Sequence, residues 1–381
     1  MYDYKSIKAY AEKHFDELLE VLKNLCEIPA PSHFEHKRAE YCKKWLENAG
    51  AKDVYIDEAL NVVFPLNCEN SNEITVIVAH TDTVFPDTEP MPYKDDGEKI
   101  FCPGVGDDTA SLTVLLFTAK YFIENHLSPE KGVMFVCNSC EEGLGNLKGT
   151  KQIFNDYAGR IAQFISFDSN INVIADRCVG SHRYEVEINT AGGHSYLAFG
   201  IPNAIAELSK LITNIYAINI PKRENSKTSY NVGTIEGGTS VNTIAQNAKM
   251  LCEYRPDNME CLSIMQKEFE RIFAGIREPG VDIKVTRIGE RPCMGEIDIE
   301  KIEKMAKICE NIILETTGSQ VTRKPSSTDC NIPLSMGIPA LCIGVYNGGG
   351  SHTREEWVEK APLKDGLEIG IKSVIGLTEV L

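Results

Sequence analysis

Acidic residues and histidines follow the apolar segments of this sequence where buried β-strands would end. The residues in such positions are His80, Asp82, Glu141, Glu142, Asp168 and His352, with Asp107 and Asp108 in a glycine-containing turn. In open parallel sheets, ligands bind at the carboxyl ends of the strands, so we expect these side chains to converge. Imidazole and carboxylate groups are ligands of divalent metal ions. The pattern predicts two metals sharing a carboxylate, and hydrolytic chemistry.

His80 and Asp82 lie two residues apart just after a strand end, which lets both side chains project to the same side. A metal-bound histidine commonly donates its other ring N–H to a carboxylate, which fixes the tautomer. We therefore expect His80 to bind metal and Asp82 to orient it. The alternative is a capped turn with a surface histidine.

Asp107 and Asp108 precede an apolar helix expected over 109–125. Either acid could be a plain N-cap. Two acids beside the tight Gly104-Val-Gly106 turn exceed what capping needs, and a carboxylate can bridge two cations. The glycines also suggest a dinucleotide-binding loop, but the third glycine is absent and two carboxylates would repel a pyrophosphate.

Glu141 and Glu142 are neighbours in an extended turn, so one can bind metal while the other faces the bound water. Paired carboxylates in a cleft of low dielectric resist double ionisation unless a cation is near. The alternative is a solvated acidic turn. Cys137 and Cys140 resemble half of a zinc knuckle, but no second Cys-x-x-Cys exists, and we interpret them as core residues.

Asp168 and His352 have less local context. A strand-end turn is the alternative for Asp168, and a mobile loop histidine is the alternative for His352. His352 follows three glycines and needs a backbone with positive φ to point inward. Five other histidines lack such a context and are expected at the surface or in packing: His14, His33, His36, His126 and His182.

Length, charge and cysteine content limit the class of protein. A chain of 381 residues favours two domains. The net charge of −16 would repel nucleic acid and anionic membranes, so neither is an expected partner. From the sequence we expect neither a signal peptide nor a membrane span. Thirteen scattered cysteines suit free thiols in a reducing compartment, so we expect a cytoplasmic protein.

The elements that must position these residues alternate between helix and strand in the first part of the chain. Helices are expected over 7–23, 34–49 and 109–125, and strands over 52–57, 61–66, 74–80, 133–140 and 163–167. The fully apolar strand ending at His80 must be buried on both faces, so it lies centrally in a parallel sheet.

Around Val179 the pattern changes. Ser181–Thr190 alternates polar and apolar residues, as a half-exposed antiparallel strand does. A β-α-β-β-α-β order continues with elements expected over 204–217, 228–236, 248–254, 259–275 and 281–288. The α/β pattern then resumes with a helix over 300–316, a strand over 340–345 and a helix over 364–377.

We therefore predict an α/β protein with a central, mostly parallel sheet flanked by helices and an inserted α+β, ferredoxin-like domain. The catalytic domain would comprise residues 1–178 and 294–381, and the inserted domain residues 179–293.

Eight short motifs, in order along nearly the whole chain, resemble those of the M20 metallopeptidases. This family includes glutamate carboxypeptidase, peptidase T, dipeptidases and N-acyl amino-acid deacylases. The motifs are His-Thr-Asp-Thr-Val (80–84), Gly-x-Gly-Asp-Asp (104–108), Glu-Glu-Gly-Leu-Gly (141–145), Phe-Asp (167–168), Gly-Gly-His-Ser (192–195), Gly-Gly-Thr-Ser-Val-Asn (237–242), Ser-Thr-Asp (327–329) and Ser-His-Thr (351–353). None is decisive alone, but eight in sequence are highly specific.

The resemblance implies a centre of two zinc ions, which cobalt or manganese could replace. The implied ligands are His80 and Asp168 for one ion, Glu142 and His352 for the other, and Asp107 as the bridge between them. Glu141 would be the general base, and Asp82 the acid that orients His80.

The resemblance also makes the inserted domain a lid and dimerisation module, so a homodimer is expected. His194 would stabilise the developing oxyanion, in dimeric members at the partner's site. Asn242 and Arg255 match lid positions that hold the substrate's carboxylate. Two departures from the family pattern touch no metal ligand but could change substrate preference: Thr109 in place of Lys, and Ser326-Ser327 in place of two glycines.

The expected activity is hydrolysis of a peptide bond in a small peptide, as a dipeptidase, tripeptidase or carboxypeptidase. An N-acyl amino-acid deacylase with the same site is the alternative. A non-catalytic metal- or peptide-binding protein is a remote alternative, disfavoured because Glu141, which binds no metal in this scheme, is present.

Overall fold

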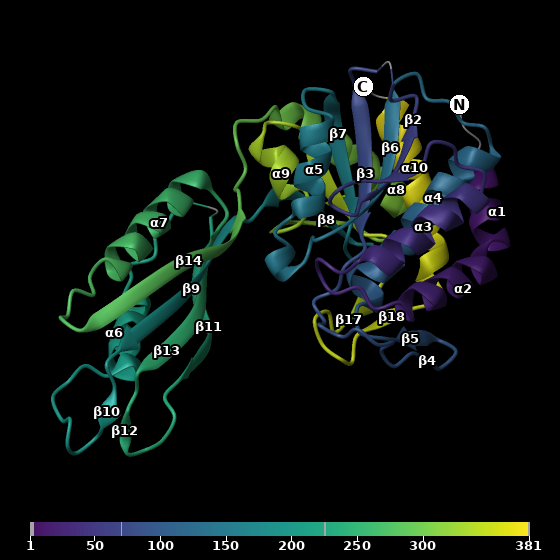
Figure 1. The fold of residues 1–381 in the computed structure, drawn as a ribbon. Coiled ribbons are helices and arrows are strands. Elements are labelled where there is room, and N and C mark those ends of the chain that lie inside the picture. Colours follow the sequence, from purple (N-terminus) through teal and green to yellow (C-terminus); the bar gives the residue numbers. More distant parts are fainter. Residues whose placement is uncertain (1–3, 70, 225, 380–381) are drawn as a thin grey trace. The chain divides into compact units, whose positions relative to one another are not determined.

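The computed structural model describes residues 4–69, 71–224 and 226–379, so the first three residues, which entered the targeting prediction, lie outside it. The chain divides into two compact units (Figure 1): unit 1 is Met1–Cys178 with Gly295–Leu381, and unit 2 is Val179–Met294. Within the described residues, no helix is long and apolar enough to cross a membrane.

Among its described residues, unit 1 is built on an eight-stranded sheet in the order β1-β2-β6-β3-β7-β16-β8-β15. The four strands β6, β3, β7 and β16 run parallel to one another, and β2 and β8 are antiparallel to their neighbours β6 and β16. The strands are β1 (Tyr55–Ile56), β2 (Val62–Leu66), β3 (Ile74–His80), β6 (Gly132–Asn138), β7 (Ile161–Phe167), β8 (Val173–Cys178), β15 (Thr322–Ser326) and β16 (Ala340–Ile343). β3 is buried along its whole length, as predicted for a central strand.

Helices flank this sheet (Figure 1), and the mostly parallel arrangement confirms the predicted fold class. The helices of unit 1 are α1 (Tyr4–Lys13), α2 (Phe15–Cys26), α3 (His36–Asn48), α4 (Ser111–Glu124), α5 (Lys148–Asp156), α8 (Ile299–Thr317), α9 (Asn331–Ser335) and α10 (Pro362–Glu379). α10 contacts α1, α4 and α8. The single N-terminal helix predicted over 7–23 is wrong: α1 and α2 are separate because the backbone of His14 leaves the helical region.

Several short elements were not predicted. A second sheet, in the order β17-β18-β5-β4, consists of β4 (Lys94–Asp95), β5 (Lys99–Phe101), β17 (Gly348–Gly349) and β18 (Trp357–Glu359). The edge strand β15 has the sequence Thr-Arg-Lys-Pro-Ser and lacks an apolar run, and its proline is tolerated at a sheet edge. Such strands form because their partners hold them, which local sequence patterns do not reveal.

Unit 2 has its own antiparallel sheet, in the order β11-β13-β9-β14 among its described residues, and α6 and α7 lie on one face of it (Figure 1). Its elements are β9 (Ser181–Thr190), β10 (Gly193–His194), α6 (Ala204–Tyr216), β11 (Thr228–Gly237), β12 (Thr243–Ile244), β13 (Asn247–Pro256), α7 (Met259–Phe273) and β14 (Val281–Arg291). Alternate residues of β9, such as Tyr184, Val186 and Ile188, pack into a core shared with both helices. A lid or dimerisation role for this unit stays a prediction.

Candidate metal centre

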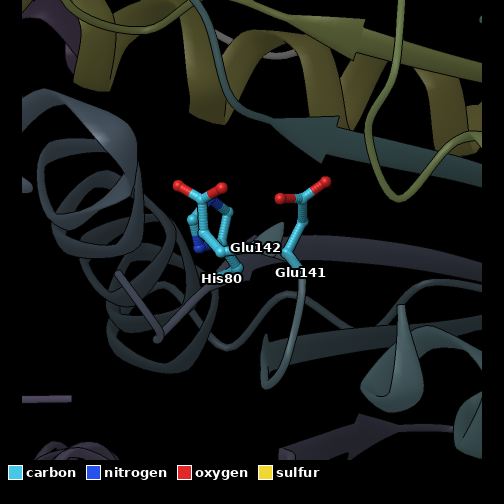
Figure 2. Close-up of side chains that lie close together, drawn as sticks. All are labelled: His80, Glu141 and Glu142. Carbon is cyan, nitrogen blue, oxygen red and sulfur yellow. The ribbon is translucent and has the colours of Figure 1, made fainter. Parts of the chain in front are cut away.

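The acidic residues and histidines of unit 1 lie at the carboxyl ends of neighbouring parallel strands. His80 ends β3, Glu141 and Glu142 follow β6, and Asp168 directly follows β7. Because β3 lies between β6 and β7, these strand ends meet at one edge of the sheet. His80, Glu141 and Glu142 project from this edge toward the same side, with the two carboxyl groups separated (Figure 2).

Two groups of candidate ligands share Asp107. In the group His80, Asp107 and Asp168, and in the group Asp107, Glu142 and His352, one ligand atom of each residue lies within 4.8 Å of the others. Asp107 Oδ1 is 3.1 Å from His80 Nε2, and Asp107 Oδ2 is 3.2 Å from His352 Nε2. The two oxygens of one carboxylate therefore face two different imidazoles, an arrangement that suits a ligand bridging two metal ions.

The structure shows that Asp107 and Asp108 make different contacts, a difference that the local sequence pattern did not reveal. Asp108 Oδ2 accepts a hydrogen bond from the backbone N–H of His80 at 2.9 Å, so its side chain supports the strand end. The peptide bond between the two acids is cis. Neither acid is the N-cap of α4, because a π-helical turn over Val105–Ala110 precedes that helix.

Asp82 is fully buried and holds both His80 and the turn that carries the two glutamates. Its Oδ1 is 3.4 Å from His80 Nδ1, and its carbonyl oxygen is 3.0 Å from the same nitrogen. Its carboxylate accepts hydrogen bonds from the backbone N–H groups of Glu141 at 2.9 Å and Glu142 at 3.0 Å, and from Ser32 Oγ at 2.6 Å. The sequence predicted the contact with His80 but not the contacts with the turn.

His352 lies on an exposed loop between β17 and β18, and its φ of 65° is the positive value expected for an inward-pointing side chain. Its Nε2 is 3.3 Å from Glu142 Oε1. Arg354 in the same loop forms an ion pair with Asp87 at 2.7 Å and lies over the ring of Phe85 at 4.8 Å. These contacts anchor the loop to the segment that follows β3.

Burial and mutual repulsion make this cluster of acids hard to ionise without a cation. Burial raises the pKa of Asp168 well above its usual range, and the nearby Asp107 and Asp108 add to the effect. Burial also raises the pKa of Glu142 to about 7. Hydrogen bonds to Asp107 and Glu142 raise the pKa of His352 to about 10. When no metal is bound, protonated imidazoles supply the positive charge that balances these carboxylates. Bound divalent ions would supply that charge in their place.

The donor set fits divalent metal ions. Two imidazole nitrogens and three carboxylates converge, which is the ligand chemistry of zinc and of the borderline ions that can replace it. A carboxylate can bind with either or both oxygens, so five residues can serve two ions when one of them bridges. When bound, such ions polarise a substrate carbonyl and lower the pKa of a water molecule.

No role was predicted from the sequence for two buried acids that lie behind the candidate ligands. Asp329 appeared there only as part of a motif, and Glu35 was not singled out. Asp329 accepts hydrogen bonds from Asn138 Nδ2 at 2.7 Å and Thr150 Oγ1 at 2.5 Å, and burial together with Glu141 raises its pKa to about 7. Glu35 accepts the backbone N–H of Cys140 at 3.1 Å. β6 ends before Cys140, which has a φ of 56°, so the strand predicted to reach residue 140 is too long. All thirteen cysteines lie in the described residues and are buried thiols outside any disulfide, as expected.

The three remaining predicted residues lie in unit 2, two of them close together and the third elsewhere on the sheet. His194 is exposed in β10, and Asn242 is its neighbour, because the backbone N–H of Ser195 donates to the Asn242 carbonyl at 2.9 Å. Arg255 lies eight residues along β13 from Asn247, which is about 27 Å at the rise of a strand. Their roles toward a substrate stay predictions.

The parallel sheet and the carboxylate–imidazole cluster at its strand ends define a metal-dependent hydrolase. The model of peptidase family M20/M25/M40 matches residues 76–376, and the chain belongs to this family.

Similar proteins agree with this assignment. A putative succinyl-diaminopimelate desuccinylase of Mycobacterium tuberculosis is 22% identical over 348 residues, which cover 89% of this chain and 93% of that protein. The solved structure of a di-peptidase from Saccharomyces cerevisiae matches with a TM-score of 0.77 and 14% identity over 99% of each chain. A dinuclear metal binding peptidase of the M20 family from Bacillus subtilis matches with a TM-score of 0.63 and 16% identity, over 98% of this chain and 100% of that chain. At these identities, the solved structures show a shared fold.

Proposed function

We propose that this protein is a peptidase with two zinc ions that cleaves small peptides carrying a free carboxylate. The observation that carries the proposal is the position of Asp107, whose two oxygens face His80 Nε2 and His352 Nε2. In this scheme Asp168 completes the first metal site and Glu142 completes the second. The solved M20 structure from Bacillus subtilis is of a dinuclear metal-binding protein, which supports the same arrangement here.

Glu141 is the proposed general base. It is buried and lies outside both groups centred on Asp107, yet its carboxylate is within 4.8 Å of ligand atoms of His80 and Glu142. From this position it takes the proton of the attacking water and returns it to the leaving amine. Asp82 holds the backbone of Glu141 in place, so the base does not depend on a flexible loop.

The test compares Glu141→Gln with Glu142→Gln. Glu141→Gln should keep both metal ions and lose roughly 10²- to 10⁴-fold in kcat, because proton transfer fails while the ligands remain. Glu142→Gln should lose bound metal as well. Metal content by elemental analysis and steady-state rates give the two readouts. Full activity of Glu141→Gln would show that Glu141 is not the general base.

An amide substrate that is not a peptide is the second candidate. The Mycobacterium tuberculosis relative is named as a putative desuccinylase, which favours an N-acyl amino acid as the alternative substrate. A panel of dipeptides, tripeptides, and N-acetyl and N-succinyl amino acids, assayed with the same metal-loaded protein, decides between the two classes. The metal chemistry is common to both, so the panel tests substrate class alone.

The separation of Arg255 from His194 and Asn242 supports the proposed homodimer. Asn242 precedes β13, whereas Arg255 lies near the far end of that strand, about 27 Å from Asn247, and the extended chain of a dipeptide spans only about 7 Å. A second copy of the chain, joined through unit 2, would resolve this if all three residues contact substrate. Light scattering measures the state directly, and a monomer would mean that the three residues do not act on one substrate.

A further inference from the structure

The Gly104-Val-Gly106 turn holds a carboxylate from a distant part of the same chain. Glu356 Oε2 accepts the backbone N–H of Gly104 at 2.7 Å, and its Oε1 accepts those of Gly106 at 2.9 Å and Asp107 at 2.7 Å. Glu356 is 1% exposed. Successive backbone N–H groups in a turn form a concave site for an anion. The glycine turn is therefore an anion site after all, filled by Glu356 instead of a nucleotide phosphate.

The glycines allow this close approach. Gly104 has a φ of 77°, a backbone conformation that favours glycine. A Cβ atom at Gly106 would lie 3.0 Å from Glu356 Oε1 and 3.0 Å from the ring of Tyr346, closer than nine in ten real contacts of Cβ atoms. A side chain at Gly106 would push Glu356 away from the turn, and one at Gly104 would collide with Thr83.

Glu356 also belongs to the loop that carries His352. Three residues separate the two, and β18 begins directly after Glu356, at Trp357. The backbone N–H of Cys102 donates to the Glu356 carbonyl at 3.1 Å, so backbone and side chain both join this loop to the turn before Asp107. One short segment thus carries a predicted metal ligand and the carboxylate that holds the backbone of another.

We propose that Glu356 is a positioning residue that fixes the bridging carboxylate of Asp107 relative to His352. This inference rests on the proposed metal centre. A charged carboxylate satisfies three amide donors at once, and those donors include the N–H of Asp107 itself. Without it the Asp107 backbone loses its restraint, and both metal sites that use this residue lose affinity.

The amide of glutamine cannot replace this carboxylate. Its oxygen can accept from Gly106 and Asp107, but its NH₂ group then faces the N–H of Gly104, and two donors repel. Glu355 provides a matched control, because it is the preceding residue, has the same chemistry and is exposed. Comparing the two Glu→Gln variants separates the contact with the turn from a general loss of negative charge in the loop.

The experiment titrates metal-free wild type, Glu356→Gln and Glu355→Gln with Co²⁺ alone, following the visible absorption of the bound ion. Glu356→Gln should bind roughly 10- to 100-fold more weakly, the usual cost of removing a group that orients a metal ligand, with an altered spectrum. Glu355→Gln should match wild type. Circular dichroism checks that each variant is folded.

A second pair of variants covers the case in which Glu356→Gln does not fold. Glu356→Asp keeps the charge but is one methylene shorter, and Gly106→Ala leaves Glu356 intact while crowding it. Both should weaken Co²⁺ binding. Wild-type affinity in the folded variants overturns the inference. If wild type itself binds no metal, the proposed centre fails instead, so the two failures are distinguishable.

Discussion

At the scale of single residues, the acids of this site divide into those that face the imidazoles and those that hold the others in place. Asp107 belongs to the first kind, and Asp82, Asp108 and Glu356 belong to the second, since each accepts backbone N–H groups of a neighbouring site residue. The difference lies in what surrounds each carboxylate. Residue type alone therefore does not assign a role.

Asp82→Asn tests one of these supporting acids. Each oxygen of the carboxylate accepts one of the two glutamate N–H groups, so the NH₂ group of asparagine would face one of these donors. Metal affinity should fall roughly 10- to 100-fold. Ser32→Ala, which removes a single donor to Asp82, should have a smaller effect. Isothermal titration of the metal-free proteins measures both, and equal affinity of Asp82→Asn and wild type would contradict the supporting role.

At the scale of elements, the edge strands β8 and β15 matter because β15 leads into the segment that carries Asp329. Arg323 of β15 joins this edge to α8 through an ion pair with Glu310 at 2.7 Å and another with Glu303 at 2.8 Å, and it lies 3.4 Å from Asp176 of β8. The strand has little apolar surface, so this polar contact helps to hold it on the sheet.

Glu310→Gln tests the helix–strand connection and its pH dependence. The hydrogen bond from Arg323 lowers the pKa of Glu310 from its usual 4.5, so its contribution to the free energy of unfolding is full above pH 4.5 and lost as the pH falls through the lowered pKa. Near neutral pH the variant should be less stable by about 0.5–1 kcal/mol. The difference should shrink as the pH is lowered below 4.5.

Urea unfolding measured from neutral to acidic pH gives these values. Glu315→Gln, an exposed position on the same helix, should change stability little at any pH. A constant difference between Glu310→Gln and wild type at all pH values would show that the ion pair with Arg323 is not its source.

At the scale of the whole molecule, the two units have separate cores. The candidate ligands all lie in unit 1, whereas α6, α7 and the sheet of unit 2 form a hydrophobic core of their own. Metal bound at these candidate ligands would therefore be coupled directly to the folding of unit 1. The exposed His194 lies in unit 2, outside the core of unit 1, so replacing it should not affect the folding of unit 1.

Removing the metal with a chelator should lower the unfolding temperature of unit 1 and leave that of unit 2 nearly unchanged. Bound metal stabilises the folded state by about 2.7 kcal/mol when its free concentration is 100 times the Kd. Differential scanning calorimetry with and without chelator separates the two transitions. An equal shift of both transitions, or no shift in either, would contradict the assignment of the metal sites to unit 1.

Much of the fold could be predicted because its central elements are strongly patterned. β3 is apolar on both faces and β9 alternates with a period of two, and each forms where its pattern predicts. β15, β17 and β18 escaped prediction, because short strands at edges and in loops draw their stability from partners elsewhere. The break at His14 escaped for a similar reason, since that residue is buried and its Nε2 lies 3.7 Å from Glu124 of α4.

The sequence by itself determined which strands end in acids and histidines, because strand ends follow from local apolar runs. From these ends alone came the expectation of a divalent-metal site. Only the family resemblance distinguished the two acids at 107–108 in the sequence, and the tertiary structure places Asp107 beside both imidazoles. The tertiary structure also brought Glu356 to a turn about 250 residues earlier in the chain. That contact depends on loops meeting in space, and in the sequence Glu356 appears only as one acid in a charged stretch. Local patterns report burial and periodicity, whereas the partner of a charge is set by packing.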